Sequence, residues 1–216
     1  MKEILKLTAS LTLICAIAGA ALAYFNALTT APKAKAQIAQ RTAKMRLVLP
    51  AETAETEEVA TAKNGVVFFA AKDASGRVIA WCAQSSDDHG FGGKITILAG
   101  LDATDGTIRA IVVSENSETP GIGSNLCERS VKRSIWSIFR KSSDTAISLP
   151  PNRYLDGYNG QKLPTEGQFT LAEKSAPGKI VPVSGATITS RAILNTVNKI
   201  CEAWQQEKPT TITIAN

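Results

Sequence analysis

The sequence predicts an α+β protein in which one membrane-spanning helix precedes an antiparallel sheet packed with helices. Three observations predict this class. A long uncharged apolar segment lies near the N-terminus, four strand-like stretches follow one another in the middle of the chain, and two patterns with helical spacing come after them.

Composition and charge exclude several functions. The formal net charge of +5 is mild, and no basic block is interleaved with aromatic residues, so nucleic acid is not an expected partner. Four scattered cysteines without a CxxC pair argue against a Cys/His metal site. The single histidine, His89, is expected to be a surface residue and not a catalyst.

The N-terminal segment is the strongest single signal. No charged residue occurs between Leu7 and Pro32, and the segment is longer than the roughly 20 apolar residues that a membrane-spanning helix needs. Tyr24 and Phe25 stand where an interfacial aromatic anchor is expected. We therefore expect residues 1–30 to be a membrane anchor.

A second interpretation of this segment is a cleaved signal peptide. Ala21-Leu22-Ala23 resembles an A-x-A cleavage site after a short apolar region. A lipoprotein is a poor interpretation, because Ile14 precedes Cys15 where a small residue is needed. Basic residues flank the segment on both sides, so the positive-inside rule gives no clear orientation.

The rest of the chain is expected to divide into a stalk, one globular domain and a C-terminal tail, at residues 31–64, 65–207 and 208–216. The stalk is rich in alanine, threonine and charge, and it could hold one helix over residues 38–49, stopped by Pro50. Its acidic run, residues 52–58, is interpreted as solvated surface.

Four stretches rich in β-branched and aromatic residues predict antiparallel strands, at residues 66–73, 77–86, 94–102 and 107–117. The first two flank the short turn Ala74-Ser75-Gly76, and the last two flank a turn that contains Asp105-Gly106. Alternating apolar residues in the later strands indicate that one face of the sheet is buried.

Two helical patterns follow the strands. In the first, Asn125 with Glu128 resembles a capping box, and residues 131–139 carry an apolar face at helical spacing. Short strands are expected at 168–171 and 179–183. The last helix is expected from about Ser190 to Gln206, and its buried face should consist of Ile193, Val197, Ile200, Cys201 and Trp204.

Hydroxyl side chains crowd the stretch VPVSGATITSRAI, residues 181–193. One interpretation is helix capping by Thr189 or Ser190, because both residue types are favoured at helix N-termini. The other is a phosphate site, since Gly185 lets a group approach the backbone and a helix N-terminus favours anions. A hydroxyl at Thr187 could then carry the phosphate covalently.

Two glycine-containing stretches are further candidate sites. SETPGIG, residues 117–123, joins a strand to a helix, and its glycines leave backbone uncovered while Ile122 could lie against a flat ring. In GFGGKI, residues 90–95, Phe91 stands among three glycines. Each stretch can also be interpreted as ordinary structure, the first as a loop and the second as a strand entry with an aromatic plug.

Together, and in this order, the apolar N-terminal segment, GFGGKI, SETPGIG and SGATITS resemble the FMN-binding domain family. The resemblance covers about residues 1–206. The family includes the G subunit of the Rnf electron-transport complex and the C subunit of the sodium-translocating NADH:quinone reductase. The chain length and the spacing from ETPGIG to SGAT are more similar to the Rnf G subunit.

The resemblance implies that FMN is joined through its phosphate to Thr187, within a turn formed by Ser184, Gly185 and Ala186. A separate flavin transferase would make this bond, taking FMN from FAD. The family usually has an acid three residues before the serine, and this chain has Val181 there.

The resemblance also implies that the isoalloxazine ring lies near the ETPGIG loop. The candidate contacts in this loop are Glu118, Thr119, Gly121, Ile122 and Gly123.

The function implied is an electron relay within a membrane-bound ion-translocating oxidoreductase complex, because the flavin supplies the redox chemistry. The chain offers no convincing set of general acid, base and nucleophile, so it would be a redox subunit of a translocase and not a stand-alone catalyst. Other membrane and redox subunits would be its partners. The domain would stand on the outer face of the cell inner membrane, with the N-terminus in the cytoplasm.

Two alternatives to this function stay open. The first is a membrane-anchored flavoprotein of another respiratory system. The second is an anchored binding module without a cofactor, which the valine at position 181 and the ordinary capping interpretation would favour.

Overall fold

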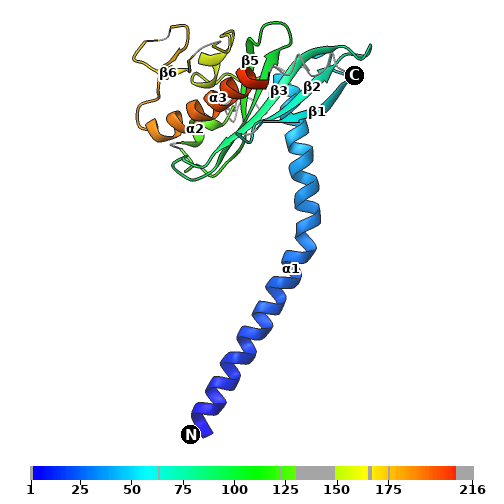
Figure 1. Ribbon diagram of the computed structural model, residues 1–216. Helices are drawn as coiled ribbons and strands as arrows, with labels where there is room; N and C mark the ends of the chain where they lie inside the picture. Colours follow the sequence, from blue (N-terminus) through cyan, green and yellow to red (C-terminus); the bar gives the residue numbers. More distant parts are fainter. Residues whose placement is uncertain are drawn as a thin grey trace, which may run out of the picture. The chain divides into compact units, whose positions relative to one another are not determined.

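The computed structural model describes residues 2–62, 64–121, 123–129, 149–164, 167–174 and 176–207. Five strands form one antiparallel sheet in the order β1-β2-β3-β4-β5, and two short strands, β6 and β7, pair in parallel (Figure 1). The predicted α+β class is confirmed.

The elements are α1 (Lys2–Val48), β1 (Glu55–Thr61), β2 (Val67–Lys72), β3 (Val78–Asp87), β4 (Ile95–Asp102), β5 (Ile108–Asn116), α2 (Ser124–Cys127), the 3-10 helix η2 (Leu155–Tyr158), β6 (Thr170–Leu171), β7 (Lys179–Ile180) and α3 (Thr187–Glu207).

The four predicted strands are confirmed as β2 to β5, each end within one residue of its expected position. The predicted turns join them. Gly76, with φ of 80°, and Gly106, with φ of 69°, take left-handed conformations that glycine adopts without strain. Turn chemistry therefore determines where these strands begin and end. The expectation of one buried face was wrong: seven of the eight residues of β4 are buried, because α3 and the end of α1 cover opposite faces of the sheet.

The fifth strand, β1, was not predicted, because the sequence placed residues 31–64 in a stalk. Glu55–Thr61 instead pairs with β2 at the edge of the sheet. Its glutamates are exposed, as the interpretation of the acidic run required, and Glu57 pairs with Lys72 of β2 at 2.5 Å. Charged residues are common on edge strands, where they discourage pairing with other chains, so such a strand carries little apolar alternation.

One face of the sheet is covered by α3, which packs against β3 and β4 (Figure 1). The predicted inner face of this helix is confirmed: four of its five residues are buried, and Trp204 is half-buried against the same core.

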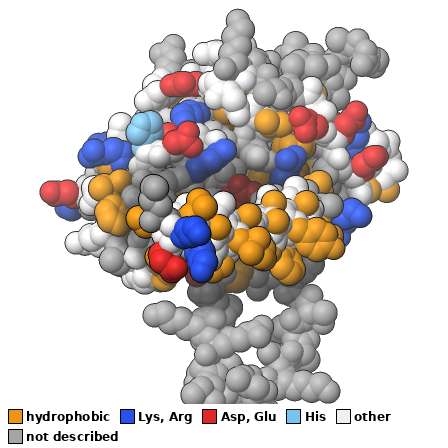
Figure 2. Space-filling view, turned by 90° about the horizontal axis from the view of Figure 1, so that it is seen from below, with side chains coloured by type: hydrophobic (Ala, Val, Ile, Leu, Met, Phe, Trp, Pro, Cys, Tyr) orange, Lys and Arg blue, Asp and Glu red, His pale blue; other side chains and the backbone are white. Residues whose placement is uncertain are grey.

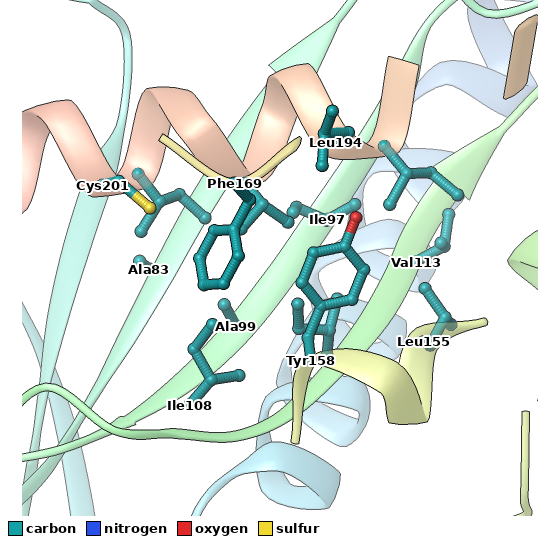
Figure 3. Packing of buried hydrophobic residues seen from close by; sticks show 14 of the residues in the cluster. Ala83, Ile97, Ala99, Ile108, Val113, Leu155, Tyr158, Phe169, Leu194 and Cys201 are labelled. Carbon is teal, nitrogen blue, oxygen red and sulfur yellow. The ribbon is translucent and has the colours of Figure 1, made fainter. Parts of the chain in front are cut away.

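Two aromatic rings from the irregular part of the chain complete this core. Tyr158 and Phe169 stack edge to face, with ring centroids 5.7 Å apart. Figure 3 shows both rings beside Ile108 and Ala99 of the sheet, with residues of α3 on their other side. The segment after η2 is thereby held against the sheet, although it has little regular structure.

The opposite face of the sheet packs against the C-terminal end of α1. Met45, Val48 and Leu49 form a second buried cluster with residues of β2 to β5, such as Leu98. The backbones approach closely at Gly100 of β4, where a Cβ atom would lie 2.0 Å from the carbonyl oxygen of Val48. Glycine is therefore required there by packing and not by backbone conformation.

The chain divides into two compact units, Met1–Thr42 and Ala43–Asn216. Helix α1 begins in the first unit and continues without a break into the second, so the predicted anchor and the helix expected over residues 38–49 belong to one helix. By length and composition this helix could cross a membrane, and its most apolar window has no part buried inside the protein. Seen from below, hydrophobic side chains form a contiguous surface patch (Figure 2).

The segment after β5 differs in part from its prediction. Helix α2 is a single turn preceded by Gly123, so the predicted capping box was wrong: Asn125 lies inside the helix and its Nδ2 donates to the Gly121 carbonyl at 2.8 Å. The apolar helical face expected over residues 131–139 lies outside the described residues. The two short predicted strands are present as β6 and β7, which are shorter than expected.

Candidate functional site

The residues before α3 form a tight turn that runs directly into the helix. The Ala186 N–H donates to the carbonyl oxygen of Val183 at 3.1 Å. Gly185 takes φ of 83°, which glycine permits at no steric cost. Helix α3 then begins at Thr187.

The predicted capping of this helix by Thr189 or Ser190 was wrong. Both residues lie inside the first turn of α3, and the N–H of Ser190 already donates to the Ala186 carbonyl at 2.9 Å. The hydroxyl pattern therefore misplaced the start of the helix by a few residues, a common error because helix ends are the least regular part of the pattern.

The four hydroxyl side chains of this stretch fall into two groups. Thr189 and Ser190 are only 1% and 0% exposed, and each makes a hydrogen bond inside the protein. Ser184 and Thr187 are exposed. Only the second group is accessible to a molecule that arrives from solvent.

Glu118, in the SETPGIG stretch, is buried at 6% exposure, and its carboxylate lies where three stretches of the sequence meet. Thr189 Oγ1 donates to Glu118 Oε2 at 3.0 Å, and the Gly92 N–H donates to Glu118 Oε1 at 3.4 Å. A Cβ atom at Gly123 would lie 2.1 Å from the same Oε2. One carboxylate therefore joins GFGGKI, SETPGIG and the first turn of α3.

The glycines of GFGGKI let this loop pack directly onto the loop that carries Glu118. A Cβ atom at Gly92 would lie 2.0 Å from the carbonyl oxygen of Ser117, and one at Gly90 would lie 2.7 Å from Glu118 Oε1. Neither position tolerates a side chain. Phe91 between them is 64% exposed, so the expectation of an aromatic plug was wrong.

The rest of the SETPGIG loop faces outward. Thr119 and Gly121 are exposed, and Gly121 takes φ of 87° while its N–H donates to Ser124 Oγ at 2.9 Å. The expected uncovered backbone is present at Gly121, but Gly123 is buried against Glu118. Ile122 lies outside the described residues.

Cys127 of α2 is buried near this carboxylate. Burial, together with the negative charges of Glu118 and Glu128, raises the pKa of its thiol to about 12. The thiol is therefore protonated at neutral pH and is not a reactive nucleophile.

A buried ion pair borders the GFGGKI loop. Asp87, at 4% exposure, accepts a hydrogen bond from Lys199 Nζ at 3.1 Å and lies 3.0 Å from His89 Nδ1. Burial acts to raise the pKa of the Asp87 carboxyl, but the hydrogen bonds from His89 and Lys199 outweigh burial and hold it below its ordinary value. The side chain of His89 is 84% exposed, as expected, and the pair ties the end of β3 to α3.

A cleft of about 990 Å³ opens beside the segment that leads into α3. Its lining includes Arg153, Tyr154, Val181, Pro182 and Ser184. This size is within the usual range for small-molecule sites. Of the turn before α3, Ser184 is among the described residues that line the cleft, whereas Thr187 at the start of the helix is not.

Sequence reasoning missed Arg191. This exposed residue follows Thr187 by four positions in α3, so the two side chains lie on the same side of the helix. Arg191 lies one turn into α3, and its exposed guanidinium makes it a candidate partner for an anion held at the start of the helix. The four-residue spacing from Thr187 was visible in the sequence and could have revealed it.

The predicted site residues are thus only partly brought together. Glu118 and Gly123 meet the first turn of α3 in the interior, whereas Thr119, Gly121 and the turn at Ser184 and Gly185 lie on the surface. The arrangement combines an exposed hydroxyl, that of Thr187, at a helix N-terminus with buried contacts of Glu118 beneath it.

These features define an FMN-binding domain. The family model described as FMN-binding domain matches residues 90–202, a span that contains GFGGKI, SETPGIG and the turn before α3, and the chain belongs to this family.

The similar curated proteins are named as G subunits of the ion-translocating oxidoreductase complex. The chain is 28% identical over 203 residues to the protein of Methanosarcina acetivorans, covering 91% of this chain and 92% of that one. It is 31% identical over 129 residues to the protein of Haemophilus influenzae, covering 60% of this chain. The chain spans 51% of the length of that relative and 61% of the protein of Vibrio cholerae, to which it is 26% identical over 152 residues.

Among solved structures, the crystal structure of Shewanella oneidensis NqrC is similar, with a TM-score of 0.47 and 20% identity. The match covers 78% of this chain and 73% of that one.

The turn before α3 fits the phosphate of FMN. The first N–H groups of a 21-residue helix point toward Thr187 and its neighbours, where they favour an anion. Among the described residues, no atom lies within 4 Å of the position that a Cβ on Gly185 would occupy, so the backbone can be approached closely there. Arg191 adds a cation one turn along the helix.

Proposed function

We propose that this chain is the electron-relay subunit of an Rnf-type ion-translocating oxidoreductase complex and carries FMN joined through its phosphate to Thr187. The observation that carries the attachment is the division of the hydroxyls at the start of α3. Thr189 and Ser190 are buried and hydrogen bonded, whereas Thr187 is exposed at the helix N-terminus. Family membership and the similarity to G subunits of the ion-translocating complex support the wider role.

Each part of the site has a task in this proposal. The Thr187 Oγ would form the bond to phosphorus as the pyrophosphate of FAD is cleaved by a flavin transferase, with release of AMP and the hydroxyl proton. The N–H groups of the first turn and Arg191 would hold the phosphate oxygens. Bound FMN supplies the redox chemistry, and the protein fixes its position and surroundings.

The proposal places the chain in the cell inner membrane through α1, with the domain on the outer face. Its partners would be the other membrane and redox subunits, which would supply the electron entry and the ion path. Helix α1 has no charged residue between Leu7 and Pro32, so it offers no group that could conduct an ion on its own.

Mass spectrometry of the full chain, produced together with a flavin transferase, tests the attachment. We expect a mass increase of one FMN moiety on the peptide that contains Thr187, and yellow colour that survives denaturation. Thr187→Ala should abolish both, whereas Thr56→Ala, at another exposed threonine, should abolish neither. Flavin released on acid denaturation would contradict the covalent bond, and a colourless protein would favour the cofactor-free binding module.

A further inference from the structure

The positive charge of the chain is concentrated in one stretch of α1. Five basic residues lie between positions 33 and 46, and no acidic residue occurs from Ile4 to Ala51. The other 19 of the 24 Lys and Arg residues are matched in number by the 19 Asp and Glu residues, so this stretch accounts for the whole formal net charge of +5. Charge of one sign gathered in one helix indicates a partner of the opposite sign.

Lys33 and Lys35, the first two cations of the stretch, have no counter-charge in their own helix. Both side chains are exposed, and neither can form an ion pair three or four positions away, because no acid occurs there. The other end of the apolar segment differs, since Lys6 lies 3.7 Å from the carboxylate of Glu3. The end of the segment nearer the domain is therefore the one that lacks a carboxylate.

The next cations of the stretch are placed differently. Lys44 Nζ donates to two carbonyl oxygens of β5, those of Val113 and Ser114, at 3.3 and 2.6 Å, so it belongs to the contact between α1 and the sheet. Arg41 follows Lys35 by six positions, about 9 Å along the helix, which is close to the Debye length at physiological salt. An anion at the end of the apolar segment therefore interacts mainly with the two lysines.

The length of the helix places these two lysines at the level of lipid headgroups. From Lys6 to Lys33 the helix rises about 40 Å, at 1.5 Å per residue. A bilayer has a hydrocarbon core of about 30 Å and is about 40–45 Å thick with its headgroup regions. When the uncharged segment crosses the core, the flexible stems of Lys33 and Lys35 carry their ammonium groups into the headgroup layer.

We infer that Lys33 and Lys35 bind the phosphate groups of anionic phospholipids, in the leaflet on the domain side of the membrane. Basic residues beside a membrane are attracted to anionic lipids, and two such residues close together favour an anionic headgroup over a zwitterionic one. An acidic segment of a partner protein is the competing occupant. Headgroups fit better, because both lysines directly follow the apolar segment and lie where lipid already surrounds the helix. This inference rests on the membrane placement of α1 proposed above.

Native mass spectrometry of the full chain, released from nanodiscs with equal amounts of phosphatidylglycerol and phosphatidylcholine, tests the lipid contact. We expect the parent chain to retain phosphatidylglycerol over phosphatidylcholine several-fold, and the double variant Lys33→Gln/Lys35→Gln to retain both lipids nearly equally. The matched control is Lys174→Gln/Lys179→Gln, which removes the same number of charges from exposed positions of the domain and should keep the parent preference. Glutamine has a helix propensity close to that of lysine, so α1 should stay intact.

The other results overturn the inference. A parent chain without lipid preference, or a Lys33 and Lys35 variant that keeps the preference, would reject this pair as the lipid contact. An equal loss in the control would show that total charge, and not position, determines the preference. Alkaline carbonate extraction of the parent from vesicles of the same lipids separates these failures from failure of the proposed membrane placement. A chain that resists extraction but has no lipid preference rejects only the lipid contact, whereas an extracted chain rejects both proposals.

Discussion

Replacing Glu118 with glutamine should destabilise the domain, because the carboxylate and its main donor, Thr189, are buried. Glutamine keeps the shape of the side chain but replaces one acceptor oxygen with an NH2 group, which would then face Thr189 Oγ1 or the Gly92 N–H. Hydrogen bonds to charged groups contribute roughly 1.5–3 kcal/mol each. The Gly92 bond, at 3.4 Å, is long and counts for little, so the loss arises mainly from the Thr189 bond at 3.0 Å.

Removing the charge also relieves the cost of burying it, which reduces the net effect to about 2 kcal/mol. For a protein of this size that corresponds to a fall in Tm of roughly 4–8 °C. Thermal unfolding of the full chain in detergent measures it, and Glu115→Gln at an exposed position of β5 is the control, with an expected change within about 0.5 kcal/mol.

A double-mutant cycle with Thr189→Val then isolates the bond itself. Because the two side chains are in direct contact, the two changes should not be additive, and the coupling energy should be about 1–2 kcal/mol. Additive effects, or a Glu118 variant as stable as the Glu115 control, would refute the claim that this carboxylate holds the SETPGIG loop against the first turn of α3.

Three further outcomes follow from the described contacts. Arg191→Gln should slow FMN transfer to the chain several-fold without changing the unfolding midpoint, with Lys179→Gln as a control whose transfer rate should not change. The pKa of Asp87 is lowered in the folded protein, so its charge stabilises the fold above the unfolded-state pKa of about 4. This contribution is lost as the pH falls through the folded-state pKa. The difference in unfolding free energy between the parent and Asp87→Asn, measured by urea unfolding, should therefore shrink from pH 7 to pH 3. Gly100→Ala should cost about 1–3 kcal/mol by overpacking, whereas Gly157→Ala, where no described atom lies within 4 Å, should be nearly neutral in the same assay.

The sequence predicted the parts of this protein that depend on local patterns. Alternating apolar residues and glycine turns located β2 to β5, and the helical spacing located the inner face of α3. Strand β1 was not predicted, because it forms by pairing with β2 and its own residues, many of them acidic and exposed, carry no apolar alternation. Helix start signals were also ambiguous, since hydroxyls at Thr189 and Ser190 can cap a helix or form internal bonds equally well.

The hydrogen bonds of Glu118 beneath the site could not be predicted, because they join distant parts of the chain. GFGGKI, SETPGIG and SGATITS were each visible as separate stretches, but nothing in their spacing indicates that Glu118 bonds to both Gly92 and Thr189. The glycines gave a misleading signal as well. Gly123 was expected to leave backbone uncovered, whereas its missing side chain is required by close packing against Glu118 and Thr189.

Val181 is where the family pattern places an acid, and its surroundings limit what that acid could do. The side chain is 39% exposed and lies on the wall of the cleft, three residues before Ser184 and outside α3. A carboxylate at such a position would be solvated, so it would add little to stability and would not alter the turn that presents Thr187. Under the proposed attachment, the acid would act on the transferase or on its FAD while they are bound, and we expect valine to change only the rate of that attachment.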